Sequence, residues 1–127
     1  MRWNHVGIKS RDVGKSLHFY CDLLGLERRE VIEIMGKTLV FVGNDTTLIE
    51  IEPGAPSDRQ ADPRSQTGLY HLGFEVRDLD GLLARLTSDG VPVVLPPFRT
   101  RPDRRVAFVE DPDGVFVQLI EMTSGSS

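Results

Sequence analysis

Four side chains of this sequence have types and positions that suit metal-dependent chemistry. His5 and His71 each precede a glycine by two residues inside an otherwise apolar segment, and Glu50 and Gln118 each stand between two apolar residues. Two imidazoles, one carboxylate and one carboxamide suit a single divalent ion, either zinc, nickel, cobalt, manganese or iron. Such a set leaves coordination positions for water or a substrate.

The two histidine segments belong to a longer internal repeat. Equivalent positions keep their order along the chain at an offset of about 65 to 68 residues, a drift that a few loop insertions would produce. The matched pairs are His5 with His71, Asp12 with Asp78, Gly25 with Gly90, Val40-Phe41-Val42 with Ala107-Phe108-Val109, and Ile49-Glu50-Ile51 with Val117-Gln118-Leu119. We therefore predict a single domain over residues 1–127, built from modules 1–52 and 68–122 and a connector, 53–67.

Length, composition and charge narrow the class of protein. The chain has 127 residues, enough for one domain with a real core, and it lacks both a signal-peptide layout and an apolar run long enough to span a bilayer. We expect a cytoplasmic protein with no membrane partner. A net charge of -4 argues against general nucleic-acid binding, which normally requires a basic surface. Cys21 is the single cysteine, so no internal disulfide forms.

The elements that must position the four side chains follow the same plan in both modules. In the first, alternation predicts a strand over Trp3–Lys9, and Asp12 as a cap with Gly25 as a terminator predicts a helix over about 12–24. Three strands follow, at Leu26–Ile34, Thr38–Val42 and Thr47–Glu52. The first module is therefore predicted to be βαβββ.

The second module repeats this order. A strand over Leu69–Val76 leads to Asp78 as a helix cap, and leucines spaced at i, i+3, i+4 and i+7 predict a helix that Gly90 ends. Short strands are predicted at Val91–Leu95 and Val106–Val109, followed by a strand at Val115–Met122. Between the first two lies a predicted loop carrying four arginines: Arg99, Arg101, Arg104 and Arg105.

Strand alternation then predicts where the chemistry lies. If each helix covers the apolar face of its sheet, His5, Glu50, His71 and Gln118 all lie on the uncovered, concave faces. Pairing the two modules would bring all four together. Glu121, three residues after Gln118, is expected to face the opposite side of its strand.

The sequence resembles the vicinal oxygen chelate superfamily, which includes glyoxalase I, methylmalonyl-CoA epimerase, fosfomycin-resistance enzymes, extradiol dioxygenases and bleomycin-resistance proteins. The similarity covers Trp3–Glu121 and rests on five segments: His5-Val6-Gly7-Ile8, Ser16-Leu17-His18-Phe19-Tyr20 before Leu24-Gly25-Leu26, Ile49-Glu50-Ile51, His71–Val76, and Phe108–Gly114. The resemblance implies an α+β fold in which two βαβββ modules form a cupped mixed sheet around a metal. It also implies a homodimer, because in many short members the two modules that share a site come from different subunits.

Carried over by position, the resemblance places the metal ligands at His5, Glu50, His71 and Gln118. Gln118 departs from the glutamate that several branches have there, which leaves Glu50 as the single carboxylate able to act as a base. The implied function is that of a metal-dependent lyase or isomerase of the glyoxalase type, which removes a proton next to a carbonyl and stabilises a metal-bound enediolate.

Three other functions remain open on sequence. They are an isomerase like methylmalonyl-CoA epimerase, whose ligand set resembles this one with its modules exchanged, an extradiol-type ring-cleaving dioxygenase, and a metal-free protein that binds a small molecule and confers resistance. The expected ligand is a small carbonyl compound, and an anionic one would suit the arginines Arg99, Arg101, Arg104 and Arg105 at a site mouth. Trp3 and Phe116 share faces with His5 and Gln118 and are expected to line the pocket or fill the cup.

Overall fold

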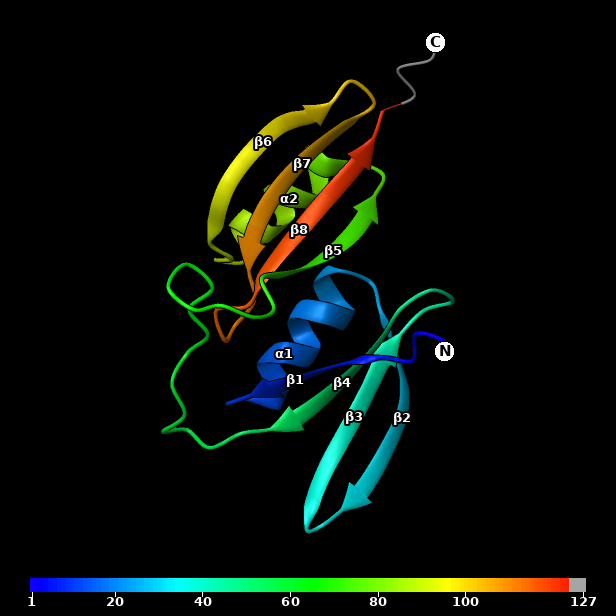
Figure 1. Cartoon of the computed structure of the whole chain (residues 1–127), viewed down its shortest axis with the longest axis vertical. Helices are drawn as coiled ribbons and strands as arrows, with labels where there is room; N and C mark the ends of the chain where they lie inside the picture. The colour runs from blue at the N-terminus through cyan, green and yellow to red at the C-terminus, as the bar shows by residue number, and fades with distance from the viewer. Residues whose placement is uncertain (124–127) are drawn as a thin grey trace. The chain divides into compact units, whose positions relative to one another are not determined.

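The computed structural model describes residues 1–123, which form two four-stranded sheets (Figure 1). The chain divides into two compact units, Met1–Arg59 and Gln60–Ser127, and the division falls inside the predicted connector. In Figure 1 the helical segments of each unit pack on one face of their own sheet. The α+β class and the βαβββ plan predicted from the sequence are confirmed.

The first unit has its strands in the order β1-β4-β3-β2. Its elements are β1 (Val6–Ser10), α1 (Val13–Leu17), η1 (His18–Leu23), β2 (Glu27–Ile34), β3 (Lys37–Gly43) and β4 (Leu48–Pro53). Strand β1 runs parallel to β4, whereas β2 and β4 are both antiparallel to β3. Strand β1 begins at Val6, later than the strand predicted at Trp3–Lys9, and His5 lies immediately before it.

The second unit has the equivalent order, β5-β8-β7-β6. Its elements are β5 (His71–Val76), α2 (Leu79–Ser88), β6 (Val93–Arg101), β7 (Arg104–Glu110) and β8 (Phe116–Met122). Strand β5 is parallel to β8, and β7 is antiparallel to both of its neighbours. The predicted repeat is thus present in the pairing of the strands as well as in the sequence.

Both helical segments begin and end as the sequence predicts. The side chain of Asp12 accepts a hydrogen bond from the Lys15 backbone N–H at 3.2 Å, and that of Asp78 accepts one from Gly81 at 3.0 Å. Each carboxylate satisfies a backbone donor that the first turn leaves without a helical partner. At the other ends, Gly25 and Gly90 have φ of +84° and +86°, in the left-handed region that glycine adopts at least cost.

The first helix differs from the prediction in its second half. The α-helical turns stop at Leu17, and a π-helix continues to Leu23 with the Leu24 N–H bonded to the Phe19 carbonyl at 3.0 Å. The π-helix still buries Phe19 and Tyr20. Apolar spacing cannot distinguish the two forms over one turn, because both bring these side chains to the core.

The helix-facing side of each sheet forms the core. Fully buried side chains alternate along the central strands: Val42, Ile49 and Ile51 in the first unit and Val109, Val117 and Leu119 in the second. In the second unit, α2 contributes the buried residues Leu79, Leu82 and Leu86. Because successive side chains point to opposite faces, Glu50 and Gln118 lie on the sides away from these cores.

The predicted arginine loop is wrong: Arg99 and Arg101 lie in β6, and Arg104 and Arg105 lie in β7. Pro96 and Pro97 suggested that a loop began there, yet β6 runs through them. Strand β6 is at the edge of its sheet, and its pairing with β7 shifts between Leu95 and Phe98. An edge strand with a bulge tolerates proline, because its outer N–H groups have no ladder partner to lose.

Candidate functional site

In the first unit, His5 and Glu50 lie beside each other. The His5 Nε2 atom is 4.0 Å from the Glu50 carboxylate, and both side chains are partly exposed. The other ring nitrogen, Nδ1, lies 2.6 Å from Asn4 Oδ1. Since a carbonyl oxygen only accepts, Nδ1 is the donor in this hydrogen bond, and Nε2 is the ring nitrogen on the Glu50 side.

In the second unit, His71 and Gln118 occupy the equivalent positions. The His71 ring meets Phe108 edge to face at 5.1 Å between centroids, just as His5 meets Phe41 at 5.6 Å. Phe108 pairs with Gln118 across β7 and β8, and Phe41 pairs with Glu50 across β3 and β4. Each unit therefore holds one histidine and one oxygen donor on the same face of its sheet, beside one phenylalanine.

The glycine two residues after each histidine has a spatial role. Gly7 pairs with Glu50, and Gly73 pairs with Gln118, each across a parallel ladder. A Cβ atom at Gly7 or at Gly73 would lie 3.5 Å from the side-chain oxygen of its partner. A Cβ atom at that distance would make an ordinary van der Waals contact, so each glycine marks the same position beside its partner side chain in the two units.

The chemistry of the donor set fits a divalent metal. The His71 Nδ1 atom is buried and has no hydrogen-bond partner among residues 1–123. A buried polar atom without a partner loses the free energy of a hydrogen bond, and a ligand bound there would restore it. Within the same residues, no three His, Cys, Asp or Glu side chains gather closely enough to hold a metal, and each unit holds one pair of the predicted ligands.

Glu121 lies on the helix side of its sheet, as expected. One carboxylate oxygen accepts a hydrogen bond from the Leu79 N–H, at the start of α2, at 2.9 Å. The other oxygen accepts from Arg105 at 3.1 Å. Glu121 therefore anchors α2 to its sheet and is not available on the face that carries Gln118.

The arginines predicted to bind an anionic substrate are engaged elsewhere. Arg105 bonds Asp80 at 3.0 Å as well as Glu121, and these two hydrogen bonds raise the pKa of its guanidinium. Arg99 donates to the Pro102 carbonyl at 3.1 Å, and Arg104 donates to Asp103 at 3.2 Å. Arg101 is exposed at the tip of the β6–β7 hairpin.

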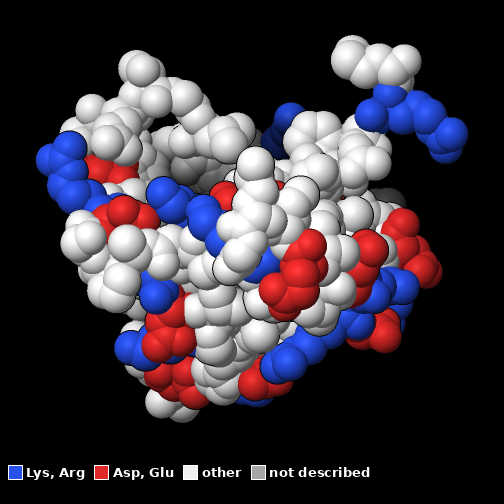
Figure 2. All heavy atoms as spheres, turned by 90° about the horizontal axis from the view of Figure 1, so that it is seen from below, with Lys and Arg blue, Asp and Glu red and all other residues white. Residues whose placement is uncertain are grey.

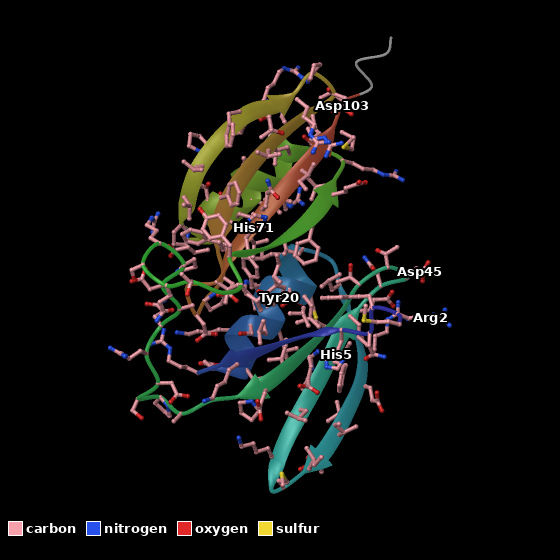
Figure 3. All side chains as sticks on the ribbon, viewed as in Figure 1. Arg2, His5, Tyr20, Asp45, His71 and Asp103 are labelled. Carbon is pink, nitrogen blue, oxygen red and sulfur yellow. The ribbon has the colours of Figure 1, made fainter. Side chains whose placement is uncertain are left out.

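The two aromatic residues predicted to line the site differ in exposure. Trp3 is 80% exposed, whereas Phe116 is buried in a cluster with Val106 and Phe108. Phe116 pairs with His71 across β5 and β8 and so lies on the same face of the sheet as Gln118. Figure 3 shows His71 at the start of β5 and His5 at the start of β1.

The third histidine, His18, and the single cysteine, Cys21, both lie in the π-helical segment η1. His18 Nδ1 forms a hydrogen bond with the Asp22 carboxylate, one turn along the helical segment, at 2.9 Å. Burial is the main cause that raises the pKa of the Cys21 thiol, while nearby Arg28 lowers it. A thiol with a raised pKa is a poor nucleophile at neutral pH, so Cys21 does not add a reactive group.

Surface charge is mixed on the face that Figure 2 shows. Lysine and arginine are interspersed there with aspartate and glutamate, so that face offers no broad basic surface of the kind that binds nucleic acid. None of the helices described in residues 1–123 has the length and apolar character needed to cross a lipid bilayer.

Comparison with known proteins agrees with this geometry. The sequence model of the family described as the glyoxalase/bleomycin resistance protein/dioxygenase superfamily matches residues 2–119. A probable lactoylglutathione lyase from Synechocystis sp. is 32% identical, over 94% of this chain and 95% of its own. A lactoylglutathione lyase from Neisseria meningitidis is 33% identical, over 98% and 94%.

Solved structures support the fold. A glyoxalase family protein from Bacillus cereus superposes with a TM-score of 0.82, over 97% of this chain and 95% of its own, at 18% identity. At that level of identity the likeness concerns the arrangement of strands and helices, and it agrees with the repeated βαβββ plan.

Proposed function

Since the chain belongs to the glyoxalase/bleomycin resistance protein/dioxygenase superfamily, we propose that it is a metal-dependent lyase or isomerase of the glyoxalase type. The observation that supports this most is the repeated arrangement: His5 and Glu50 adjoin Phe41 in one unit, and His71 and Gln118 adjoin Phe108 in the other. The relatives named lactoylglutathione lyase favour the same reaction class.

In this proposal, His5, Glu50, His71 and Gln118 together hold one divalent ion. When bound, the ion supplies Lewis-acid stabilisation of the negative charge that develops on a substrate carbonyl oxygen. The Asn4 amide orients His5, and the unmet nitrogen of His71 gains a partner. The family resemblance supports a homodimer as the working form.

Glu50 is the base in the proposed reaction. The bond between hydrogen and the carbon next to the carbonyl breaks, Glu50 takes the proton, and the electron pair moves onto the carbonyl oxygen. The hydroxyl proton on the first carbon then moves to the enolate oxygen, and Glu50 returns its proton to the former carbonyl carbon. The first carbon becomes the new carbonyl, with no net gain or loss of atoms. Gln118 is neutral and cannot take the proton, which gives the two oxygen donors different roles.

Elemental analysis of the purified chain and of two variants tests the proposal. We expect about one divalent ion per chain in the wild type and its loss in His71→Ala. In Glu50→Gln we expect the fold to persist while turnover of the methylglyoxal–glutathione hemithioacetal falls at least about 100-fold. His18→Ala is the control and should keep both metal and turnover, because His18 pairs with Asp22 in the helical segment.

Absence of a bound metal would favour a different function. If the wild type holds no metal even after incubation with nickel, zinc and manganese, the enzyme proposal fails. The neutral Gln118 favours the alternative in that case, since a site with one carboxylate is weaker for a divalent ion. The chain would then be a metal-free binding protein of the same superfamily, and it should bind a small molecule without turnover.

A further inference from the structure

The positively charged side chain of an arginine lies beside the candidate site of the second unit, on a segment that the sequence predicts only as a connector. Arg64 belongs to the predicted connector, and its guanidinium lies over the Phe116 ring at 4.9 Å from the ring centroid. The guanidinium also lies 3.7 Å from the Glu110 carboxylate. These two contacts give Arg64 a defined position, although its side chain is 62% exposed.

The contacts of Arg64 place it on the same face as the proposed ligands. Glu110 pairs with Phe116, and Phe108 pairs with Gln118, across the same two strands. Residues two apart on a strand share a face, so Glu110, Phe116 and Gln118 all face one side. Since Arg64 contacts two of these residues, its charge lies on the side of the sheet that carries Gln118.

Aromatic contacts connect Arg64 to His71. Phe116 is the direct partner of His71 across β5 and β8. The Tyr70 ring contacts both, with centroids 5.8 Å from Phe116 and 5.2 Å from His71. The guanidinium thus adjoins the aromatic group that surrounds the proposed ligand.

The connector is held against its own unit near Arg64. The Ala61 N–H donates to the Asp113 carbonyl at 2.9 Å, and the Gln60 amide donates to the Pro112 carbonyl at 3.4 Å. Both acceptors lie in the turn between β7 and β8. The backbone three residues before Arg64 is therefore fixed by the turn that leads into Phe116.

The guanidinium keeps the capacity to bind an anion. Arginine has five N–H donors in a planar fork, and the 3.7 Å separation from Glu110 is longer than a hydrogen bond. An exposed ion pair of this length is weak, and Glu110 leaves the N–H donors of Arg64 available. Among the four arginines predicted from the sequence, Arg105 bonds Asp80 and Glu121 on the helix side of the sheet. Arg104 lies on the Gln118 face, but it pairs with Met122, four residues from Gln118, and donates to Asp103.

We propose that Arg64 determines substrate specificity by binding a carboxylate or another anionic group of the substrate. The inference rests on the proposed function, since it concerns the same site. It assigns anionic carbonyl compounds as the substrate class. A neutral compound of the same size would bind without this contact and would react less efficiently.

Turnover of two matched hemithioacetals tests the inference. Methylglyoxal forms one with 3-mercaptopropionate, which has a carboxylate, and one with 3-mercaptopropionamide, which is neutral and of nearly the same size. In Arg64→Gln we expect kcat/KM for the carboxylate adduct to fall about tenfold, as for loss of a charge-assisted hydrogen bond, with no change for the amide. Arg64→Lys should retain part of the preference, because it keeps the charge.

Arg85→Gln is the matched control. Arg85 lies in the last turn of α2, on the helix side of the sheet, and its substitution removes the same charge from the same unit. We expect it to leave kcat/KM for both adducts unchanged. Equal losses on both adducts in Arg64→Gln, or no loss on either, would overturn the inference while leaving the proposed function standing.

A binding measurement separates the inference from the proposed reaction. Calorimetry with S-hexylglutathione and with its diethyl ester compares an unreactive probe that has two carboxylates with the form in which both carboxylates are esterified. We expect the wild type to prefer the anionic probe and Arg64→Gln to lose that preference, whether or not the chain turns over a hemithioacetal. A wild type that shows no preference between the probes, or binds neither, would overturn the inference.

Discussion

The two oxygen donors of the candidate site differ by one charge, and that difference bears on the substrate. With Glu50 as the single carboxylate, a divalent ion held by the four predicted ligands would keep a formal charge of about +1. The guanidinium of Arg64 adds a second positive charge on the Gln118 side. Both charges favour an anion, so the neutral Gln118 is consistent with an anionic substrate.

Asn4 is a positioning residue, and removing its amide tests that role. In Asn4→Ala, His5 loses the acceptor that fixes its tautomer and ring orientation. Partners of this kind typically change metal affinity about 10- to 100-fold. We expect the dissociation constant for zinc, measured by competition with a chelator, to rise within that range while the far-ultraviolet circular dichroism spectrum stays unchanged.

The conservative variant Asn4→Asp keeps an acceptor oxygen at the same position. We expect it to hold zinc at least as tightly as the wild type, since a carboxylate orients an imidazole in the same way. A purely structural role for Asn4 would instead give Asn4→Ala a normal zinc affinity with a lower stability.

The candidate site residues could be proposed from sequence because they repeat. His5 and His71 each precede a glycine by two, and the structure pairs this glycine with Glu50 in one unit and with Gln118 in the other. Arg64 was not predictable, because its contact with Phe116 joins residues 52 positions apart and has no counterpart in the first module. The Asn4 contact was missed as well, since the pattern of apolar residues gives no information on the hydrogen bond of an adjacent polar side chain.

The connector and the β7–β8 turn form one element at the edge of the second unit. Gly114, in this turn, has a φ of +86°, and a Cβ there would lie 2.6 Å from the Ala61 carbonyl oxygen. Gly90 has the same φ, yet a Cβ there would meet nothing within 4 Å. Comparing the same substitution at the two glycines therefore distinguishes the cost of a left-handed backbone from the cost of a steric clash.

We predict that Gly114→Ala destabilises the protein more than Gly90→Ala does. The left-handed conformation alone costs a residue with a Cβ about 1–2 kcal/mol, which is the loss expected for Gly90→Ala in urea denaturation. Gly114→Ala should exceed this loss, because the backbone of the connector must also move. Equal losses would show that the connector is not held tightly against the turn.

The predicted ends of helices and strands were most accurate where a particular residue type caps or ends the element. Asp78 and Gly90 fix the ends of α2 through a cap and a left-handed residue, and both functions are visible in the sequence. The extent of β6 was not, because Pro96 and Pro97 end most strands and are accepted here at a sheet edge. That error moved four arginines into a loop and made them candidates for the site.

At the scale of the whole molecule, the chain uses one plan twice, and the four candidate ligands differ between the two units by a single charge. The sheets have the same strand order, and the caps, terminating glycines, phenylalanines and histidines occupy equivalent places. The difference is that Glu50 in one unit stands where Gln118 stands in the other. The repeat therefore predicts that the carboxylate can be moved between the units.

We predict that the exchange variant Glu50→Gln/Gln118→Glu binds one divalent ion with an affinity close to that of the wild type. It keeps two histidines, one carboxylate and one carboxamide, and the carboxylate introduced at position 118 would lie opposite Gly73, as Glu50 lies opposite Gly7. Glu50→Gln alone should bind the ion more weakly, because it has no carboxylate. Calorimetric titration with zinc compares the three proteins. If the exchange variant binds no better than Glu50→Gln, the two positions do not serve one ion, and the metal site proposed for the two units is wrong.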